Sequence, residues 1–182
     1  MRSLLKFILA LAVALGAMLC FRALVVTIYT VEGNGLAPVF VAGDHVMVNR
    51  WSYGLRTGSD NGLFSYGRLC RQPVAQGDLI AYEDPRDNTG KSVLFGRCRA
   101  LPGDTIVEDG RTMVVPSIEN CSDADYFWVE ALGKANPTDS RQLGFISERL
   151  IIGRAFLVVF NHDASQPLWQ GWHHDRLLLL KE

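Results

Sequence analysis

The chain has no excess of charge of either sign and no run of basic residues. Its 182 residues include 18 Lys and Arg and 19 Asp and Glu, which gives a formal net charge of −1. Proteins that bind nucleic acid usually present clustered basic side chains to the phosphate backbone, so we expect no nucleic-acid partner. The chain also lacks internal repeats and low-complexity tracts, which leaves one domain of ordinary size plus a short appendage.

Helical periodicity is scarce after the N-terminal segment, and residues 168–172 are the one short candidate for a helix. The rest of the chain shows patterns typical of short strands, with alternating, β-branched or aromatic side chains. We expect strands at residues 45–49, 78–82, 92–95, 105–107, 111–115, 126–129, 149–152 and 155–160. Turn signals separate these segments, and Asp109-Gly110 is the strongest candidate for a hairpin turn. The sequence therefore predicts a mostly β domain of short antiparallel strands.

The N-terminal residues form the longest apolar stretch of the chain. An uncharged run of fifteen residues lies between Lys6 and Arg22, and apolar residues resume after Arg22. A membrane-crossing helix needs about 20 residues. The segment that begins at Leu4 is long enough if the side chains of Lys6 and Arg22 extend to opposite interfaces of the membrane. A cleaved signal peptide is the alternative. Because apolar residues continue directly into the next motif, we favour an uncleaved transmembrane anchor over residues 1–30.

The basic residues near the N-terminus predict the orientation of such an anchor. Arg2 and Lys6 favour a cytoplasmic N-terminus, because short cytoplasmic segments carry an excess of Lys and Arg. Residues 31–182 would then form an extracytoplasmic domain, held by one helix at the outer face of the cytoplasmic membrane.

Two features of this outer domain stay open in the sequence. Cys70, Cys98 and Cys121 would lie in an oxidising compartment, where they allow one disulfide of unassigned pairing. Buried, unpaired cysteines are an equal alternative. Residues 51–71 interleave glycines with aromatic residues, a composition too aromatic for a disordered linker. We expect an ordered excursion that packs against the sheet or touches lipid headgroups.

Neither a cofactor nor a metal is expected. The candidate metal ligands near the C-terminus are His162, His173, His174 and Asp175. Adjacent histidines in a polar stretch usually lie on solvated surface, so we interpret them as surface residues rather than ligands.

Five blocks in a fixed order carry the functional signal. They are residues 33–38, 41–50, 96–104, 136–141 and 151–155. In order and spacing they resemble the type I signal peptidase (leader peptidase) family, and residues 171–176 are similar to the ends of members from Bacteroides-like bacteria. The resemblance extends from Arg22 to Arg176. It implies the β-domain of that family, preceded by one transmembrane helix.

The same resemblance places glycine or proline where the family holds its catalytic groups. In the first block, Gly35 corresponds to the nucleophilic serine of the family, and Gly33 corresponds to the serine whose hydroxyl belongs to the oxyanion hole. Gly96 stands at the general-base lysine, and Pro137 at the serine that orients this lysine. These residues supply neither hydroxyl nor amine, and loss of nucleophile or base lowers turnover about a million-fold in a well-studied serine hydrolase. The resemblance therefore implies a catalytically inactive pseudoenzyme.

Other family positions are retained. Arg97, Asp139 and Arg141 match residues that support the active site through ion pairs. Leu36 and Pro38 would line the substrate groove, in which the family binds an extended signal peptide as an added strand. The resemblance thus implies a membrane-anchored protein that binds signal peptides, preproteins or a membrane protein complex.

Two other functions stay open. The chain would be an active signal peptidase, a serine-type endopeptidase in signal peptide processing, if displaced groups such as Cys98, Lys91 or Ser92 replaced the catalytic residues. Cys98 is the candidate nucleophile nearest Gly96 and should point to the same side of its strand. The other possibility is a non-enzymatic assembly or structural subunit that uses the domain for docking.

Overall fold

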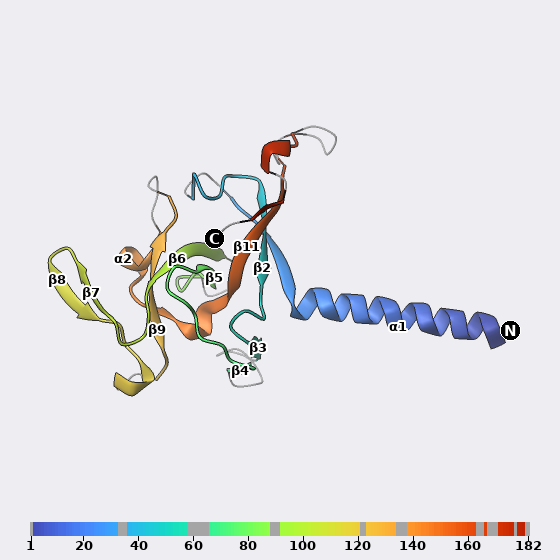
Figure 1. Ribbon diagram of the computed structural model, residues 1–182, viewed down its shortest axis with the longest axis horizontal. Helices are drawn as coiled ribbons and strands as arrows, with labels where there is room; N and C mark the ends of the chain where they lie inside the picture. The colour runs from blue at the N-terminus through green and yellow to red at the C-terminus, as the bar shows by residue number, and fades with distance from the viewer. Residues whose placement is uncertain are drawn as a thin grey trace.

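A computed structural model of the protein describes residues 2–32, 36–57, 66–87, 92–120, 123–133, 138–162, 166, 171–176 and 178–180 (Figure 1). One long helix projects from a domain of strands and short helical turns (Figure 1). The predicted helical segment 168–172 falls largely outside the described residues, and Trp172 forms an isolated antiparallel bridge with His162.

The N-terminal apolar segment forms helix α1 (Arg2–Leu24), which joins the domain at β1 (Val26–Thr30). Its large apolar side chains are exposed around the helix: Leu4, Phe7, Ile8, Leu9, Leu11, Val13, Leu15, Met18 and Leu19. Within the described part of the chain, none of the helices combines the length and apolarity that a bilayer crossing requires. The predicted helix is confirmed as far as Leu24, whereas residues 26–30, which the expected anchor included, form β1 and pair with β2. The role of the helix as a membrane anchor stays a prediction.

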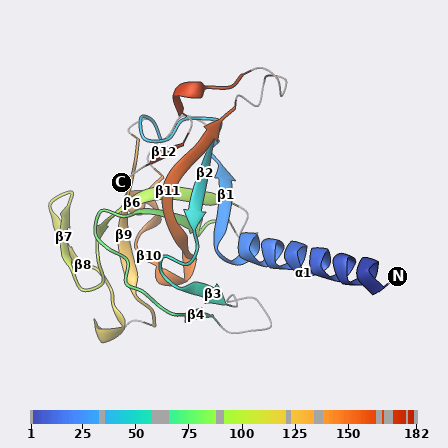
Figure 2. The same cartoon turned by 45° about the vertical axis from the view of Figure 1, so that its right-hand side comes forward.

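The rest of the chain is a mostly β domain built on one antiparallel sheet, as predicted. The strands of the main path follow the order β1-β2-β11-β5-β6-β9-β10, and β12 pairs with β11 outside this path. Their bounds are β2 (Asp44–Asn49), β5 (Leu79–Glu83), β6 (Val93–Ala100), β9 (Tyr126–Ala131), β10 (Ile146–Ser147), β11 (Ile151–Asn161) and β12 (Leu179–Leu180). Figure 2 shows β1, β2 and β11 side by side where α1 meets the domain.

Two hairpins accompany the sheet. Strands β7 (Thr105–Glu108) and β8 (Arg111–Val114) form the predicted hairpin, and both turn residues, Asp109 and Gly110, have positive φ. This conformation is typical of a tight turn whose twist matches that of its strands. The aromatic, glycine-rich stretch contains the second hairpin, β3 (Leu55–Thr57) with β4 (Gly67–Leu69), while residues 58–65 lie outside the described part.

The described residues of this stretch pack against the domain, as expected. Tyr53 is buried, and its hydroxyl donates a hydrogen bond of 2.9 Å to Oδ2 of Asp78. The guanidinium group of Arg68 donates to the backbone oxygens of Gly54, Glu148 and Ile151. The hairpin is therefore held to the strand that follows Glu148.

Strand β11 is longer than predicted, because two expected strands merge into it. Residues 148–150 form a 3-10 turn, η2 (Glu148–Leu150), and the strand then continues unbroken to Asn161. Gly153 lies where β11 passes close to the end of β2. A Cβ atom there would lie 2.9 Å from the Cα atom of Arg50, so glycine permits this close approach. The other 3-10 turns are η1 (Ile118–Asn120) and η3 (His174–Arg176).

The central strand β5 divides the core between the two faces of the sheet. Leu79 and Ala81 belong to one apolar cluster, and Ile80 and Tyr82 to another. Successive side chains of a strand point to opposite faces, so a strand buried on both faces reads as a continuous apolar run. A third cluster forms around Trp128 of β9.

A buried ion pair ties the C-terminal residues to β2. The guanidinium of Arg176 in η3 donates to both carboxylate oxygens of Asp44, at 2.9 and 2.6 Å, and Asn161 Nδ2 donates at 2.8 Å. Asp44 is fully buried. Burial raises its pKa, but hydrogen bonds from Arg176, from the N–H of Val41 and from Asn161 outweigh this effect and lower the pKa below its ordinary value.

Candidate functional site

The position that the resemblance assigns to the general base lies in the middle of β6. Gly96 pairs with Ile80 of β5 on one side and with Ala131 of β9 on the other. A Cβ atom at Gly96 would collide with Cγ1 of Val129 and would lie 2.8 Å from the carbonyl oxygen of Glu130. Strand β9 therefore occupies the space in which a side chain at residue 96 would begin.

In the first block, Gly33 and Gly35 lie outside the described part of the chain. The residues that follow them lie near Gly96, the position assigned to the general base. Leu36 packs against the apolar cluster that contains Phe95, the residue before Gly96. The ring of Phe40 meets that of Phe95 edge to face, with centroids 5.5 Å apart.

Pro38, the other predicted groove residue, is exposed and follows a cis peptide bond. The fold thus brings the described end of the first block beside β6. The use of Leu36 and Pro38 as a substrate groove stays a prediction.

The fourth block, residues 136–141, reaches the same region from the other side of β9. Its residues form a short helix, α2 (Ser140–Leu143), that the sequence analysis did not predict. Asp139 caps this helix by accepting from the N–H of Arg141 at 2.9 Å, and its second oxygen accepts from the N–H of Ala131 at 3.1 Å. Ser140 Oγ accepts from the N–H of Val129 at 2.9 Å.

These contacts satisfy two backbone donors of β9 close to Gly96. The register places Ala131 opposite Gly96, and Val129 opposite Cys98. Backbone N–H groups that are buried need a partner, so Asp139 and Ser140 hold β9 in its place against β6. Pro137, the predicted base-orienting position, lies outside the described residues.

The retained charged residues have different contacts. Arg97 donates to the carbonyl oxygen of Gly77 at 3.1 Å. Arg141 forms ion pairs with Glu108 at 2.7 Å and with Glu130 at 3.4 Å, and Arg99 contacts the same two carboxylates.

This network includes Arg99, Glu108 and Glu130, which sequence reasoning missed. Both arginine side chains are more than two fifths exposed, so each pair contributes little to stability. A supporting role for Arg97, Asp139 and Arg141 stays a prediction.

Cys98, the candidate displaced nucleophile, is unreactive in its setting. The side chain is 1% exposed, unpaired and packed in the cluster with Ile80 and Val129. Burial, together with the carboxylates of Asp78 and Asp104, raises the pKa of the thiol to about 12. Because the thiolate is the nucleophile, this thiol is inert near neutral pH.

The other candidate groups give no replacement site in the described residues. Ser92 is exposed just before β6, where its N–H donates to Asp87 at 2.8 Å, and Lys91 lies outside the described part. Cys70 is exposed and unpaired, and Cys121 also lies outside. Within the described residues, no group of three or more His, Cys, Asp or Glu side chains is placed to hold a metal ion.

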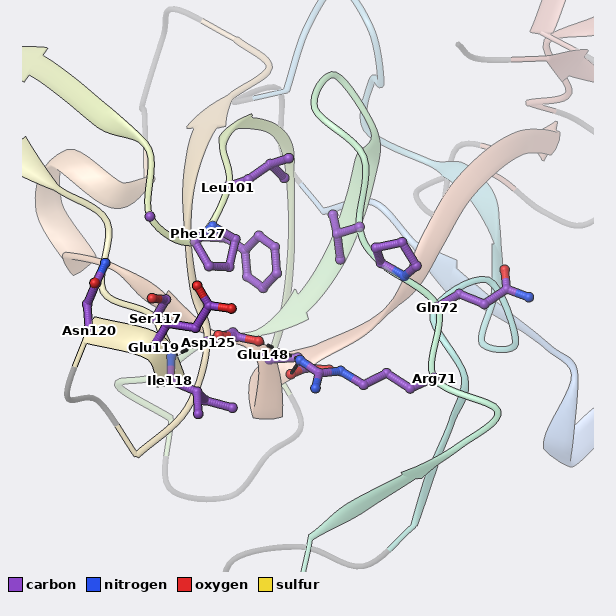
Figure 3. Close-up of a pocket in the computed structure, with 14 residues that line it drawn as sticks. Arg71, Gln72, Leu101, Ser117, Ile118, Glu119, Asn120, Asp125, Phe127 and Glu148 are labelled. Carbon is purple, nitrogen blue, oxygen red and sulfur yellow. Dashed lines mark hydrogen bonds and ion pairs between the residues drawn. The ribbon is translucent and has the colours of Figure 1, made fainter.

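A separate cavity of about 680 Å³ opens near the end of β6 (Figure 3). Its apolar walls include Val74, Leu101 and Phe127, and carboxylates surround the entrance. On that side Arg71 donates to Asp125 at 2.5 Å and to Glu148 at 2.7 and 3.0 Å (Figure 3). No motif in the sequence marks this cavity, because its lining comes from segments that lie far apart in the chain.

The family described as signal peptidase, peptidase S26, matches over residues 4–117. This range contains most of α1 and the first three blocks, including Gly96, and it ends before the fourth block. Among curated proteins, none matches the chain. Because the match covers more than half of the sequence, the chain belongs to the signal peptidase family, peptidase S26.

Proposed function

We propose that this family member is a pseudoenzyme that binds extended segments of preproteins at the outer face of the bacterial cytoplasmic membrane without cutting them. The packing around Gly96 is the observation that carries the proposal. A lysine at this position would need its Cβ atom where the side chain of Val129 and the backbone of Glu130 lie. The backbone oxygen cannot turn aside as a side chain would, because β9 pairs with β6 along this stretch.

The chemistry of the family explains why this exclusion matters. A serine hydroxyl becomes a useful nucleophile when a nearby base takes its proton. A lysine can act as that base only where burial depresses its pKa and leaves it neutral. Arg97 cannot take this role because a guanidinium group keeps its proton, and the thiol of Cys98 has a pKa raised to about 12.

The edge of the sheet supports peptide binding. Strand β1 pairs with β2 on one side and, among the described strands, has no partner on the other. An exposed edge offers backbone donors and acceptors to an added strand. Tyr29, Leu36 and Val93 pack around the apolar cluster next to this edge, where they would contact the side chains of a bound peptide.

The exposed apolar side chains of α1 support an anchoring role. Large continuous apolar surfaces are rare on soluble monomers and are normally covered by lipid or by a partner. The proposal places the N-terminus in the cytoplasm and the β-domain outside. Protease digestion of intact spheroplasts tests this orientation, because it should degrade the β-domain and spare a tag placed before Arg2.

A cleavage assay tests the absence of activity. Purified full-length protein is incubated with a preprotein that an active family member cuts, with that enzyme as the positive control. We expect no product from this chain. Processing at the signal-peptide junction by the wild-type protein would overturn the pseudoenzyme proposal.

Peptide binding is tested separately by fluorescence anisotropy with a labelled peptide that covers a cleavage site. Leu36→Asp should weaken binding at least tenfold, because it puts a charge beside the apolar cluster. Val107→Asp is the matched control, since Val107 is exposed in the β7–β8 hairpin. Equal affinities for the two variants would contradict the proposed groove.

The cavity near the end of β6 favours a second function, that of a non-enzymatic subunit of a membrane complex. Ile118 is an exposed apolar side chain that lines this cavity, and Ile118→Asp would disrupt docking there. A crosslinked partner that is lost in Ile118→Asp and kept in Leu36→Asp would support this function over peptide binding.

A further inference from the structure

The cavity near the end of β6 has a smaller neighbour. The cavity has a volume of about 680 Å³, and binding sites for small ligands usually measure about 300–1,000 Å³. The neighbouring pocket has a volume of about 240 Å³. Arg71, Ile118 and Glu148 line both of them, so the two hollows adjoin. We call the pair that shares these three residues the Ile118 groove.

The two hollows of the Ile118 groove differ in their linings. Val74, Leu101 and Phe127 give the larger one apolar walls, and the smaller one is lined by Tyr66 and Arg149. Extended peptides are recognised through successive pockets that accept alternate side chains. Two adjoining hollows of different character therefore fit an extended chain, which can place one side chain in each, better than they fit one compact molecule.

A buried hydroxyl group in the larger hollow lacks a partner. Ser117 lines the cavity and is 5% exposed. Its carbonyl oxygen accepts from the N–H of Asn120 at 3.0 Å, whereas its hydroxyl forms no hydrogen bond among the described residues. The fold does not seal this hydroxyl from solvent, as it seals Nε1 of Trp128. Unpaired polar groups in buried positions are rare and call for a partner, which a backbone group of a bound peptide would supply.

The charges of the larger hollow favour a cation in the ligand. Arg71 reaches across the entrance and pairs with Asp125 at 2.5 Å and with Glu148 at 2.7 Å (Figure 3). Arg68 also contacts Glu148, at 3.3 Å. These two arginines balance the two carboxylates. Glu119 is exposed and has no ion-pair partner among the described residues, so a charge of −1 is left at the rim of an apolar cavity.

We propose that the Ile118 groove receives an extended segment of a protein partner in which a lysine or arginine lies close to a large apolar side chain. The apolar side chain enters between Val74 and Phe127, the basic one pairs with Glu119, and a backbone group meets the hydroxyl of Ser117. This proposal rests on the docking function given above for the same cavity and states the chemistry of the partner. The groove shares no lining residue with the apolar cluster beside the β1 edge.

A peptide selection on the full chain in neutral detergent tests the groove. Random heptapeptides displayed on phage are selected on the wild-type chain and counter-selected on Ile118→Asp. Because Ile118 is 54% exposed, this substitution should leave the fold intact while it places a charge between the two hollows. We expect the recovered peptides to share a leucine, phenylalanine or tryptophan with a lysine or arginine within two positions. Recovery of no peptides, or of acidic ones, would overturn the proposal.

The ion pair is tested by a double-mutant cycle on one recovered peptide, measured by fluorescence anisotropy. Glu119→Gln should weaken binding about two- to fivefold, the size of an exposed ion pair. Replacing the basic residue of the peptide with glutamine should weaken binding to the wild-type chain equally and binding to Glu119→Gln hardly at all. Glu32→Gln, at an exposed position after β1, is the matched control and should bind as the wild type does. Fully additive effects would contradict the pairing.

The hydroxyl of Ser117 gives a test that separates binding from stability. Ser117→Ala removes a group that has no partner in the described structure, so the unfolding midpoint should not fall, whereas the recovered peptide should bind severalfold more weakly. Unchanged affinity would contradict the role of this hydroxyl. Leu36→Asp should bind the peptide as the wild type does, because Leu36 lies in the separate cluster.

A second copy of this chain is the competing occupant. Sedimentation that shows a wild-type dimer and an Ile118→Asp monomer, together with a selection that yields no peptide, would assign the groove to self-association and overturn the proposal. A crosslinked membrane partner that contacts Ile118 through an acidic segment would support the docking function and refute the partner chemistry. Selected basic peptides without any crosslinked partner would support the groove and leave the docking function refuted.

Discussion

Replacing Gly96 with alanine tests the central structural argument with the smallest possible side chain. The new methyl carbon would collide with Cγ1 of Val129 and would lie 2.8 Å from the carbonyl oxygen of Glu130. Insertion of a methylene into a packed core typically costs about 1–3 kcal/mol. Loss of glycine also restricts the unfolded chain, which offsets about 0.4–1 kcal/mol. We therefore expect Gly96→Ala to lower the free energy of unfolding by about 1–2 kcal/mol.

Thermal unfolding of the full chain in mild detergent, followed by circular dichroism, measures this effect. For a domain of this size, each 1 kcal/mol shifts Tm by about 2–4 °C, so Gly96→Ala should lower Tm by several degrees. Gly67→Ala is the matched control in a strand, because among the described atoms its Cβ would meet only the Thr57 hydroxyl, at 3.2 Å, within 4 Å. Gly153→Ala, which would also meet backbone atoms, should behave like Gly96→Ala.

The result that would refute the reasoning is a Gly96→Ala protein as stable as Gly67→Ala. Strand β9 would then yield easily to a side chain at residue 96. A lysine could be accommodated there, and the packing would no longer argue against catalysis.

Four further predictions concern other contacts and side chains of the domain. Arg176→Ala leaves the buried carboxylate of Asp44 unpaired and should cost about 3 kcal/mol in urea unfolding; Lys at 176, which keeps a positive charge, should recover part of this loss. Because the folded-state pKa of Asp44 is lowered, its contribution to stability is present above the ordinary aspartate pKa and is lost as the pH falls through the folded value. Asp44→Asn should therefore flatten the acid limb of a plot of stability against pH, and an unchanged limb would contradict the assignment. With iodoacetamide at pH 8, monitored by peptide mass spectrometry, Cys70 should react and Cys98 should stay protected until the protein unfolds. Ser140→Ala leaves the N–H of Val129 without its acceptor and should cost about 1–3 kcal/mol, whereas Ser140→Thr should retain most of the stability.

Local patterns predicted the longer strands, but they predicted neither the lengths of those strands nor the existence of β1, β3, β4, β10 and β12. The alternation at Val46 and Val48 and the turn at Asp109-Gly110 are set by neighbours in sequence, and both appear in the structure as expected. The fusion of two predicted strands into β11 depends on pairing with β2 and β5, which lie far away in the chain. Helix α2 was missed because four residues are too few to show a helical period.

The site was predictable only where a motif marked it. Resemblance located Gly96 and Asp139, but the position of β9 against Gly96 is a tertiary contact that no local pattern contains. The cavity near the end of β6 was missed for the same reason, since it is assembled from segments that carry no common signal.

The contacts around Gly96 also bear on whether activity could be restored. Asp139 and Ser140 fix two backbone donors of β9, and β6 pairs with the same strand from the other side. A lysine at residue 96 would therefore have to displace backbone that is held from both sides, in addition to regaining a serine at residue 35. Two substitutions would supply the reactive groups without the space that one of them requires. The packing of β9 against β6 at Gly96 therefore argues against a catalytic lysine at this position.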